Sequence, residues 1–382
     1  MNSAPPFHMR LLAWIPRSQC NVEESLKRMP RSFVGNSSRS EGLHFLRITV
    51  VESKLIAVYY ASGENSMNQS LSRRQFLRAS AIAGTGLALP NALFVPRKKS
   101  VLIFTKSSGF EHEVIKATPG HPSILEQAVR ALGEQHGFDV TATKDGRVFD
   151  SKFNDPQDFR FHSAVLFFTT GDLTKPGTDQ NPPMSLAGKQ ALLDAIHGGL
   201  GFVGVHAAAD TFHTEPDPDD RSNRYIAHGE HEDPYLRMLG GECITHGSTP
   251  RLQAANLIVK DKKFPGLEGV TSPVSFTEEW YSLKDFVPDI HVILALDTQG
   301  MKGEPYQRAP YPATWARMHG KGRVFYTAMG DRPENWSNTF FLNLLGGGIR
   351  WSIFTAKASL TKNLAQATPG YAEIPPKSPR TT

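Results

Sequence analysis

A histidine occupies the position where many α/β enzymes carry a catalytic nucleophile. His206 directly follows the apolar run 200–205 and precedes the segment 207–210 (AAAD), which is the strand-to-helix placement of a nucleophile elbow. That turn normally presents Ser or Cys, and imidazole does not easily support an acyl-enzyme mechanism. A histidine there can be a metal ligand or a general acid or base, or it can simply cap the following helix or hydrogen-bond the core. We take His206 and Asp210 as catalytic candidates.

Three further polar clusters are expected at the same edge of a sheet. Residues 106–112 follow an apolar run, and residues 240–246 and 278–281 lie in what we interpret as neighbouring loops. Ligands gather at the carboxyl ends of parallel strands, because loops and helix amino-termini converge there. We therefore expect these clusters to share one pocket with His206.

A divalent metal such as zinc is one hypothesis for this pocket. The ligand set would be three imidazoles and one carboxylate, which zinc accepts: His112, His206, His246 and Glu279. No close-spaced metal motif joins these residues, so the alternative is that they are separate polar loop residues. His112 and Glu279 are also candidates for proton transfer. Cys243 sits among small and apolar residues and is expected to be inert packing.

The same clusters contain residues that can bind a sugar. Aromatic rings stack on the apolar C–H faces of sugar rings, although such side chains more often fill a core. The candidate substrate-binding residues are Ser108, Gly109, Phe110, Trp280, Tyr281 and Trp315. The histidine-rich and acidic segment 213–231 is interpreted as a solvated, lid-like loop.

Short apolar runs alternate with amphipathic helical patterns in the residues that must position these groups. Buried strands are expected at 98–105, 138–143, 164–168 and 200–205, and helices at 124–136 and 186–197. This order predicts an α/β fold with a mostly parallel sheet and helices on both of its faces. The later part is more mixed, with strands at 257–259, 292–296, 314–318 and 323–328, a hairpin turn at 320–322 and a closing helix at 337–353.

Residues 72–89 carry the pattern of a twin-arginine export signal. Two adjacent arginines and an aromatic residue precede an apolar run of 11 small-residue-rich positions, which is shorter than the roughly 20 needed to span a bilayer. We expect residues 67–97 to be a signal peptide read by the twin-arginine translocase, with an uncleaved anchor as the alternative. Residues 1–66, upstream of Met67, are then an over-extended, disordered gene start. The folded protein is expected in the periplasm or elsewhere outside the cytoplasm.

Charge and cysteine content limit the remaining possibilities. Residues 1–97 contain 12 of the 42 Lys and Arg residues and 5 of the 37 Asp and Glu residues. Residues 98–382 therefore contain 30 basic and 32 acidic side chains. A nearly neutral body disfavours a nucleic-acid partner. Cys243 is the only cysteine of this body, so no disulfide forms within it. We expect one large domain at 98–356 and a flexible tail at 357–382.

Several segments, in this order along the chain, resemble the ThuA-like (trehalose utilisation) family. They are 108–112, 201–210, 240–246, 278–281, 320–326 and 336–351. The resemblance implies a class I glutamine amidotransferase-like fold without the catalytic cysteine, which is a flavodoxin-like three-layer sandwich with a mostly parallel central sheet. It also implies a role in carbohydrate catabolism, where trehalose and related disaccharides are processed through 3-keto intermediates.

Two positions depart from the family pattern. Glu111 stands where a basic residue is usual, and Gly330-Asp331 replaces a late Gly-His pair. The missing histidine puts in doubt any metal or proton-transfer role at position 331.

Two functions are expected from these observations. The first is an exported enzyme that acts on a small carbohydrate, a keto-glycoside or trehalose-like disaccharide, by isomerisation or by cleavage assisted by enolisation. The second is a non-catalytic carbohydrate- or partner-binding protein that keeps the pocket. An amidotransferase or protease is disfavoured, because position 206 is neither Cys nor Ser.

Overall fold

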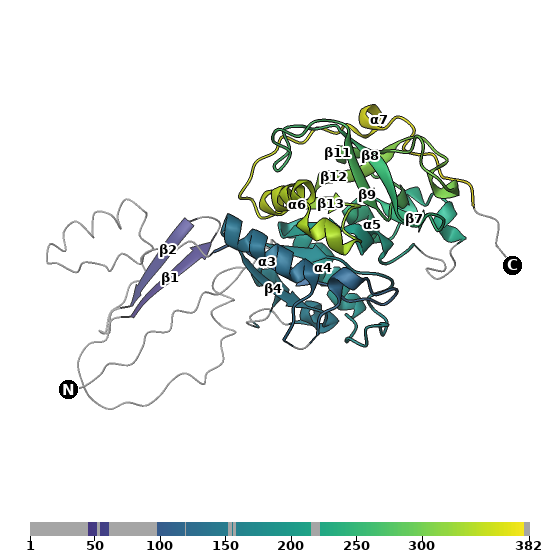
Figure 1. Cartoon of the computed structure of the whole chain (residues 1–382). Coiled ribbons are helices and arrows are strands. Elements are labelled where there is room, and N and C mark those ends of the chain that lie inside the picture. The colour runs from purple at the N-terminus through teal and green to yellow at the C-terminus, as the bar shows by residue number, and fades with distance from the viewer. Residues whose placement is uncertain are drawn as a thin grey trace. The chain divides into compact units, whose positions relative to one another are not determined.

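The computed structural model in Figure 1 describes most of the chain after residue 97 and two strands before it. The described residues are 45–51, 54–60, 98–118, 120–151, 155, 158–214 and 222–377. The chain divides into two compact units, Met1–Phe94 and Val95–Thr382. Among the described residues, no helix is long and apolar enough to cross a membrane.

The first unit contains one antiparallel pair of strands. β1 (Phe45–Val51) and β2 (Lys54–Tyr60) are both rich in β-branched and aromatic residues, which favour extended backbone. This hairpin falls within residues 1–66, where the sequence predicts disorder. The predicted signal peptide, residues 67–97, lies outside the described residues.

The second unit is built on a nine-stranded mixed sheet with the strand order β4-β3-β5-β6-β13-β12-β11-β8-β9. The strands from β4 to β13 in this order are parallel, and those from β13 to β9 are antiparallel. The bounds are β3 (Ser100–Phe104), β4 (Asp139–Thr143), β5 (Ala164–Phe167), β6 (Gly201–Val205), β8 (Gln253–Val259), β9 (Val274–Glu278), β11 (His291–Asp297), β12 (Tyr311–His319) and β13 (Gly322–Thr327).

The α/β class is therefore confirmed, but the sheet is less parallel than the sequence predicts. The strand-helix alternation that predicts parallel pairing stops after β6, and the later strands follow one another with short connections. Gly320 and Lys321 join β12 and β13 as a hairpin, as expected. Parallel pairing needs a long crossover connection, whereas antiparallel strands can be joined directly. The later strands, which lack intervening long helices, therefore pair antiparallel.

Capping residues define the helices α3 (Ile124–His136), α4 (Leu186–Gly198), α5 (Pro234–Leu239) and α6 (Thr339–Ser352). The Ser123 hydroxyl accepts a hydrogen bond from the Glu126 amide, and Asn338 does the same for Phe341. Gly137 ends α3 in the left-handed region with φ 77°. The helices predicted from the sequence are all present, with ends shifted by one or two residues.

Helices lie against both faces of the sheet around β6 and β13. Successive side chains of a strand point to opposite faces, and Phe325 and Tyr326 are neighbours on β13. A Cβ at Gly348 of α6 would meet the Phe325 ring, whereas Tyr326 and Leu239 of α5 pack beside Gly204. Because both faces are covered, β5 and β6 are buried along their whole length.

Two polar clusters expected in loops are instead partly strands. β7 (Glu242–His246) and β10 (Tyr281–Lys284) pair antiparallel and form a separate two-stranded sheet. Their cores are short and mix polar with apolar residues, so they carry no strong strand pattern. The pairing places Tyr281 opposite His246 and Lys284 opposite Glu242, which fixes these side chains more rigidly than loops would.

The prediction of a flexible tail is wrong for the described residues 357–377. The short helix α7 (Leu364–Ala367) packs on the body, and Leu364 is 3% exposed. The Asn363 side chain exchanges hydrogen bonds with the Val292 backbone, and Arg308 donates to the Tyr371 carbonyl at 3.0 Å. Proline and polar content alone predict a loose end, but these backbone contacts hold the segment in place.

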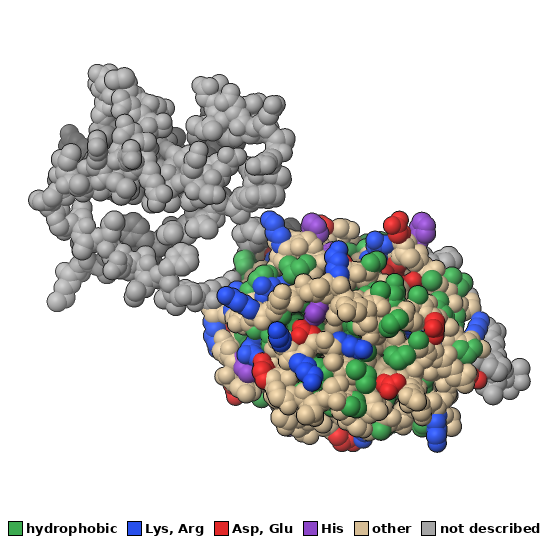
Figure 2. Space-filling model, turned by 90° about the horizontal axis from the view of Figure 1, so that it is seen from above, with side chains coloured by type: hydrophobic (Ala, Val, Ile, Leu, Met, Phe, Trp, Pro, Cys, Tyr) green, Lys and Arg blue, Asp and Glu red, His purple; other side chains and the backbone are tan. Residues whose placement is uncertain are grey.

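The surface of the body carries both signs of charge. On the face shown in Figure 2, basic and acidic side chains are interspersed and no large field of one sign is seen. This distribution agrees with the nearly balanced charge of residues 98–382.

Candidate functional site

His206 sits at a strained turn directly after β6. β6 ends at Val205, and a 3-10 helix, His206–Asp210, follows, so the predicted strand-to-helix turn is confirmed. His206 adopts φ 44°, a left-handed conformation that costs a non-glycine residue on the order of 1–2 kcal/mol. This is the strained strand-to-helix turn of a nucleophile elbow, with a histidine in place of Ser or Cys.

Hydrogen bonding fixes the tautomer of His206. Nδ1 lies 2.9 Å from the Ala328 carbonyl oxygen, which only accepts, so Nδ1 carries the proton. Nε2 then keeps its lone pair, and it has no hydrogen-bond partner in the part of the chain that the structure describes. The side chain is fully buried. An unpartnered imidazole nitrogen in a dry interior is costly unless it binds something.

His112 approaches His206 from the segment after β3. The two imidazole ring centres are 5.4 Å apart. His112 Nε2 lies 3.8 Å from Asp331 Oδ1, and its Nδ1 also lacks a partner among the described residues. Burial, followed by the neighbouring His206, lowers the pKa of His112 from 6.5 to about 3. His112 is therefore neutral at physiological pH and offers a lone pair.

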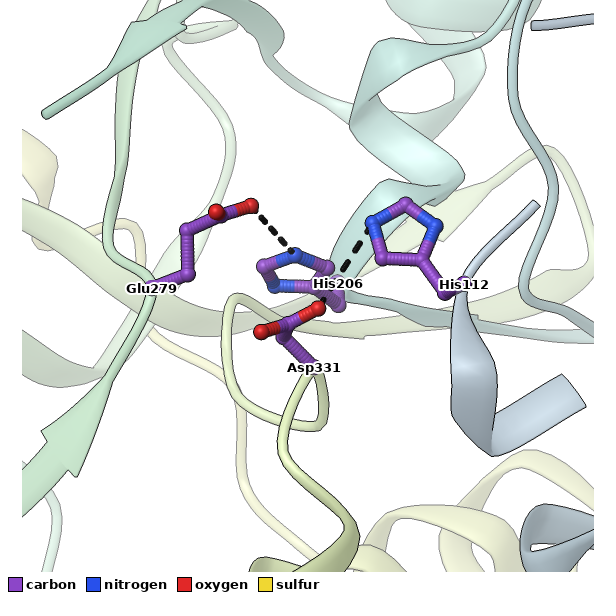
Figure 3. Close-up of side chains that lie close together, drawn as sticks. All are labelled: His112, His206, Glu279 and Asp331. Carbon is purple, nitrogen blue, oxygen red and sulfur yellow. Dashed lines mark ion pairs between the residues drawn. The ribbon is translucent and has the colours of Figure 1, made fainter. Parts of the chain in front are cut away.

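Glu279 and Asp331 complete a four-residue group, the His206 cluster (His112, His206, Glu279 and Asp331), drawn in Figure 3. Glu279 lies between β9 and β10, and its Oε1 is 3.9 Å from His206 Nε2. One ligand atom from each residue lies within 4.8 Å of the others. Four segments that are far apart in the sequence thus bring two imidazoles and two carboxylates together.

Glu278 positions the loop that carries Asp331. Its carboxylate accepts hydrogen bonds from the Gly330 amide at 2.7 Å and from the Asn335 side chain at 2.9 Å. Burial raises the pKa of Glu278. Gly330 has φ 123°, which an L side chain rarely adopts, and a Cβ there would lie 2.9 Å from Val205. The loop conformation therefore depends on a buried acceptor and on glycine.

The His206 cluster fits a divalent cation. Neutral imidazole and carboxylate oxygen form a mixed donor set that suits zinc or a similar ion, and His206 Nε2 lacks another partner among the described residues. The group within 4.8 Å contains Asp331 and does not contain the predicted ligand His246. The His246 side chain is 44% exposed, and its Nδ1 lies 3.0 Å from the Gly247 carbonyl oxygen and 3.7 Å from Glu279 Oε2.

A cavity of about 650 Å³ opens beside the cluster. Of the predicted site residues it is lined by Ser108, Gly109, Phe110, His112, Asp210, His246, Glu279 and Tyr281. His206 and Asp331 are not among the lining residues and lie behind this wall. His206 therefore does not contact a molecule bound in the cavity. This favours a role for His206 in coordinating a metal ion over direct proton transfer to or from a substrate.

Two predicted substrate-binding residues do not reach the cavity. Trp280 and Trp315 are fully buried, and their indole nitrogens donate to the carbonyls of Gln253 and Leu239. Trp315 also packs on Tyr326, with ring centres 4.3 Å apart. Both rings fill the core, which is the more common use of tryptophan. By contrast, Phe110 is 62% exposed and remains able to stack on a sugar.

Tyr281 lines the cavity and lies beside both histidines of the cluster. Its ring centre lies 4.1 Å from that of His206, and its hydroxyl is 3.5 Å from His112 Nε2. Burial raises the pKa of Tyr281 well above 10. The hydroxyl therefore stays protonated and can donate a hydrogen bond.

Asp210 is held in the cavity wall by a buried histidine. His213 Nε2 lies 2.8 Å from Asp210 Oδ1, and its Nδ1 lies 2.8 Å from Glu242 Oε1. Burial alone would lower the pKa of His213, but bonds to both carboxylates raise it. Burial likewise opposes ionisation of Asp210, yet His213 and then Arg224 leave its pKa well below the usual range. Asp210 is therefore ionised and accepts, but does not supply, protons.

This geometry corrects the interpretation of residues 213–231 as a solvated loop. His213 is 6% exposed and bridges two carboxylates, so at least its beginning is part of the core. Residues 215–221 lie outside the described residues.

A second buried group, the Lys284 cluster (Glu232, Glu242, Lys284 and Asp285), lies on the other side of His213. Its three carboxylates also place oxygen atoms within 4.8 Å of one another. Lys284 Nζ lies 3.0 Å from Glu242 Oε2 and 3.1 Å from Asp285 Oδ2, and it donates to the Ile226 carbonyl. An ammonium group of the chain itself thus fills this acidic cluster.

Sequence reasoning missed Asp331, Arg251 and His213. Asp331 was set aside because a histidine was expected there, although carboxylate oxygen is an equally good ligand for many divalent ions. Arg251 precedes β8 without any motif, and His213 lies within a segment that is polar throughout. Only the Gly-Asp pair at 330–331 offered a usable signal.

These features define an α/β protein with a large mixed sheet, in which a histidine occupies the nucleophile elbow. The family model for trehalose utilisation, ThuA, matches residues 100–352, and the chain belongs to this family. Its relation to carbohydrate utilisation follows from that membership.

The solved structures that are similar to this chain include two ThuA-like proteins. A ThuA-like protein from Bacteroides uniformis ATCC 8492 is 18% identical with a TM-score of 0.47, covering 66% of this chain and 91% of that chain. A ThuA-like protein from Parabacteroides merdae ATCC 43184 is 15% identical with a TM-score of 0.46, covering 72% and 96%. Comparison with curated proteins finds no significant match.

Proposed function

We propose that this protein is an enzyme of carbohydrate catabolism that acts on a sugar bearing a carbonyl group, such as a 3-keto-glycoside or an oxidised trehalose-like disaccharide. The reaction class is isomerisation or cleavage that begins with removal of a proton next to the carbonyl. The observation that carries the proposal is the unpartnered Nε2 of His206, which points into a four-ligand cluster beside a cavity of about 650 Å³.

Four side chains would hold a divalent cation in this enzyme: His112, His206, Glu279 and Asp331. Such an ion, when bound, polarises a carbonyl oxygen and makes the neighbouring carbon more acidic. The Nδ1–H of His206 bonds the Ala328 carbonyl, and this contact orients the ring. Burial of His206 supports this ligand role over its predicted role as a base.

Residues of the cavity wall would bind the sugar. Asp210 is ionised, so it can accept a hydrogen bond from a sugar hydroxyl, but its lowered pKa makes it a weak base. The Tyr281 hydroxyl keeps its proton and can donate to the carbonyl oxygen. Phe110 offers an exposed ring face for stacking.

Turnover of keto-sugars by purified protein tests this function. His206→Ala should lower turnover of a 3-keto-disaccharide at least about a hundredfold, since loss of a ligand should cost more than loss of its supporting contacts. Asp331→Asn preserves side-chain volume and should have a similar effect. His121→Ala, at an exposed position of the segment after β3, is the matched control. Unchanged turnover in both cluster variants would rule the proposal out.

A second candidate is a carbohydrate-binding protein that has an amidotransferase-like, three-layer scaffold but no catalytic activity. It is favoured by the absence of a hydroxyl or thiol nucleophile at position 206. Calorimetry against oxidised and unoxidised disaccharides separates the two functions. Tight binding without conversion, in the presence and absence of a chelator, would support the binder.

Export through the twin-arginine translocase is the proposed route to the periplasm. The support is the sequence pattern at 72–89. Arg73→Lys with Arg74→Lys in the full-length chain should abolish the periplasmic fraction on cell fractionation. An equal distribution of wild type and variant would contradict this route.

A further inference from the structure

Arg251 lies directly on the two carboxylates of the His206 cluster. Its Nε forms an ion pair with Glu279 Oε2, and its Nη2 lies 3.7 Å from Asp331 Oδ1. Both carboxylates are largely buried, with side-chain exposures of 3% and 11%. Arg251 is thus the cation of the chain that compensates their charge.

The guanidinium and a divalent cation would use the same two carboxylate groups: both face Asp331 Oδ1, and on Glu279 the guanidinium pairs with Oε2 while Oε1 faces His206. Two carboxylates carry two formal negative charges, and Arg251 supplies one positive charge. A divalent ion bound by His112 and His206 as well would balance both carboxylates. Because two cations held against the same two buried carboxylates repel each other strongly, occupation by one opposes the other.

Arg251 can leave this position at little cost. Its side chain is 49% exposed, so its charge can return to water without being buried elsewhere. Its guanidinium carbon also lies 6.0 Å from the centre of the Phe110 ring, at the cavity wall, where a cation–π contact can hold it. Lys284, at 1% exposure, has no such freedom.

We propose that Arg251 is an exchangeable counter-ion of the cation site. It neutralises Glu279 and Asp331 when no divalent ion is bound, and binding of the ion displaces it toward solvent and Phe110. This inference rests on the cation site of the proposed function. Arg251, which is not one of the four metal ligands, would then control the affinity of the site and its selectivity for doubly charged ions.

Calorimetric titration of the purified protein with zinc chloride tests the exchange. Arg251→Gln should bind zinc about tenfold more tightly than wild type, because the competing charge is removed but was half-exposed and screened. Arg251→Lys keeps the positive charge but cannot contact both carboxylates with one planar group. Its zinc affinity should lie between those of wild type and Arg251→Gln. Arg224→Gln removes a positive charge from the same cavity wall without touching the cluster, and it should bind zinc within about twofold of wild type.

The outcomes separate the exchange from the cation site itself. Equal affinities for wild type and Arg251→Gln, with binding lost in His206→Ala, would overturn the role of Arg251 and leave the site intact. Equal gains in Arg251→Gln and Arg224→Gln would also overturn it, since the effect would be one of overall charge. No zinc binding in any variant, or binding that survives His206→Ala, would overturn the cation site and the exchange together.

Discussion

The two acidic clusters of this protein look alike in composition but differ in what balances their charge. The His206 cluster and the Lys284 cluster each bring several ligand atoms within 4.8 Å. In the Lys284 cluster a fully buried ammonium group bonds two carboxylates and a carbonyl. In the His206 cluster the compensating cation is a half-exposed arginine, and His206 Nε2 lacks a partner among the described residues.

This difference separates a structural cluster from a candidate site. In the Lys284 cluster another ion would have to expel a buried charge, even though Glu232 Oε1 lacks a hydrogen-bond partner among the described residues. In the His206 cluster the counter-ion is half-exposed, so a ligand can replace it at lower cost. Proximity of acidic residues alone does not distinguish the two cases.

The largest effect is expected from removing the internal cation of the Lys284 cluster. Lys284→Met should lower the free energy of unfolding by about 3–5 kcal/mol, because it leaves Glu242 and Asp285 buried without their partner. Chemical denaturation measures this loss. Lys302→Met, at an exposed position, should change stability by less than about 0.5 kcal/mol. A similar small change for both variants would show that the Lys284 cluster is not held by this charge.

A pH-dependent effect is expected at the edge of the same cluster. Burial, then the charges of Asp285 and Glu242, raise the pKa of Glu232 from 4.5 to about 9. The native state therefore binds a proton between these pH values that the unfolded state releases, and stability falls as pH rises through this window. Glu232→Gln cannot ionise, so it should stabilise the protein more at pH 8 than at pH 5, by roughly 4 kcal/mol.

Denaturation of both proteins at the two pH values measures this difference. Glu230→Gln, at an exposed neighbouring position, serves as the control and should have little effect at either pH. A Glu232→Gln variant whose stability relative to wild type is the same at pH 5 and pH 8 would refute the raised pKa.

The smallest effect on stability is expected at Arg251. Its ion pair with Glu279 is half-exposed, so Arg251→Gln should change the free energy of unfolding by no more than about 1 kcal/mol. This is the counterpart of the Lys284 experiment in the His206 cluster. A loss as large as that of Lys284→Met would mean that Arg251 is a fixed structural cation, and the contrast between the clusters would fail.

The sequence predicts the fold best where local patterns and topology agree. Continuous apolar runs identify β3, β5 and β6, because both faces of these strands are covered, and Ser123 and Gly137 bound α3 by local chemistry. The pairing of β7 with β10 escapes prediction, since it depends on contacts between segments about 40 residues apart. The ordered segment after residue 357 escapes for the same reason, because its partners are Val292 and Arg308.

The candidate site follows the same division. The turn at His206 is visible in the sequence because an apolar run, a polar residue and small residues follow one another. The exchange of His246 for Asp331 is not, because it depends on the direction in which β7 and the loop after β13 present their side chains. Tryptophans at 280 and 315 are ambiguous in the sequence, and only burial assigns them to the core.

The central claim is that the His206 cluster, and not the Lys284 cluster, holds a divalent cation. Anomalous X-ray scattering at the zinc edge, on crystals soaked in equimolar zinc, tests it most directly. We predict one peak among His206 Nε2, His112, Glu279 and Asp331, with Arg251 moved toward Phe110. A peak among Glu232, Glu242 and Asp285, or none at His206, would contradict the account.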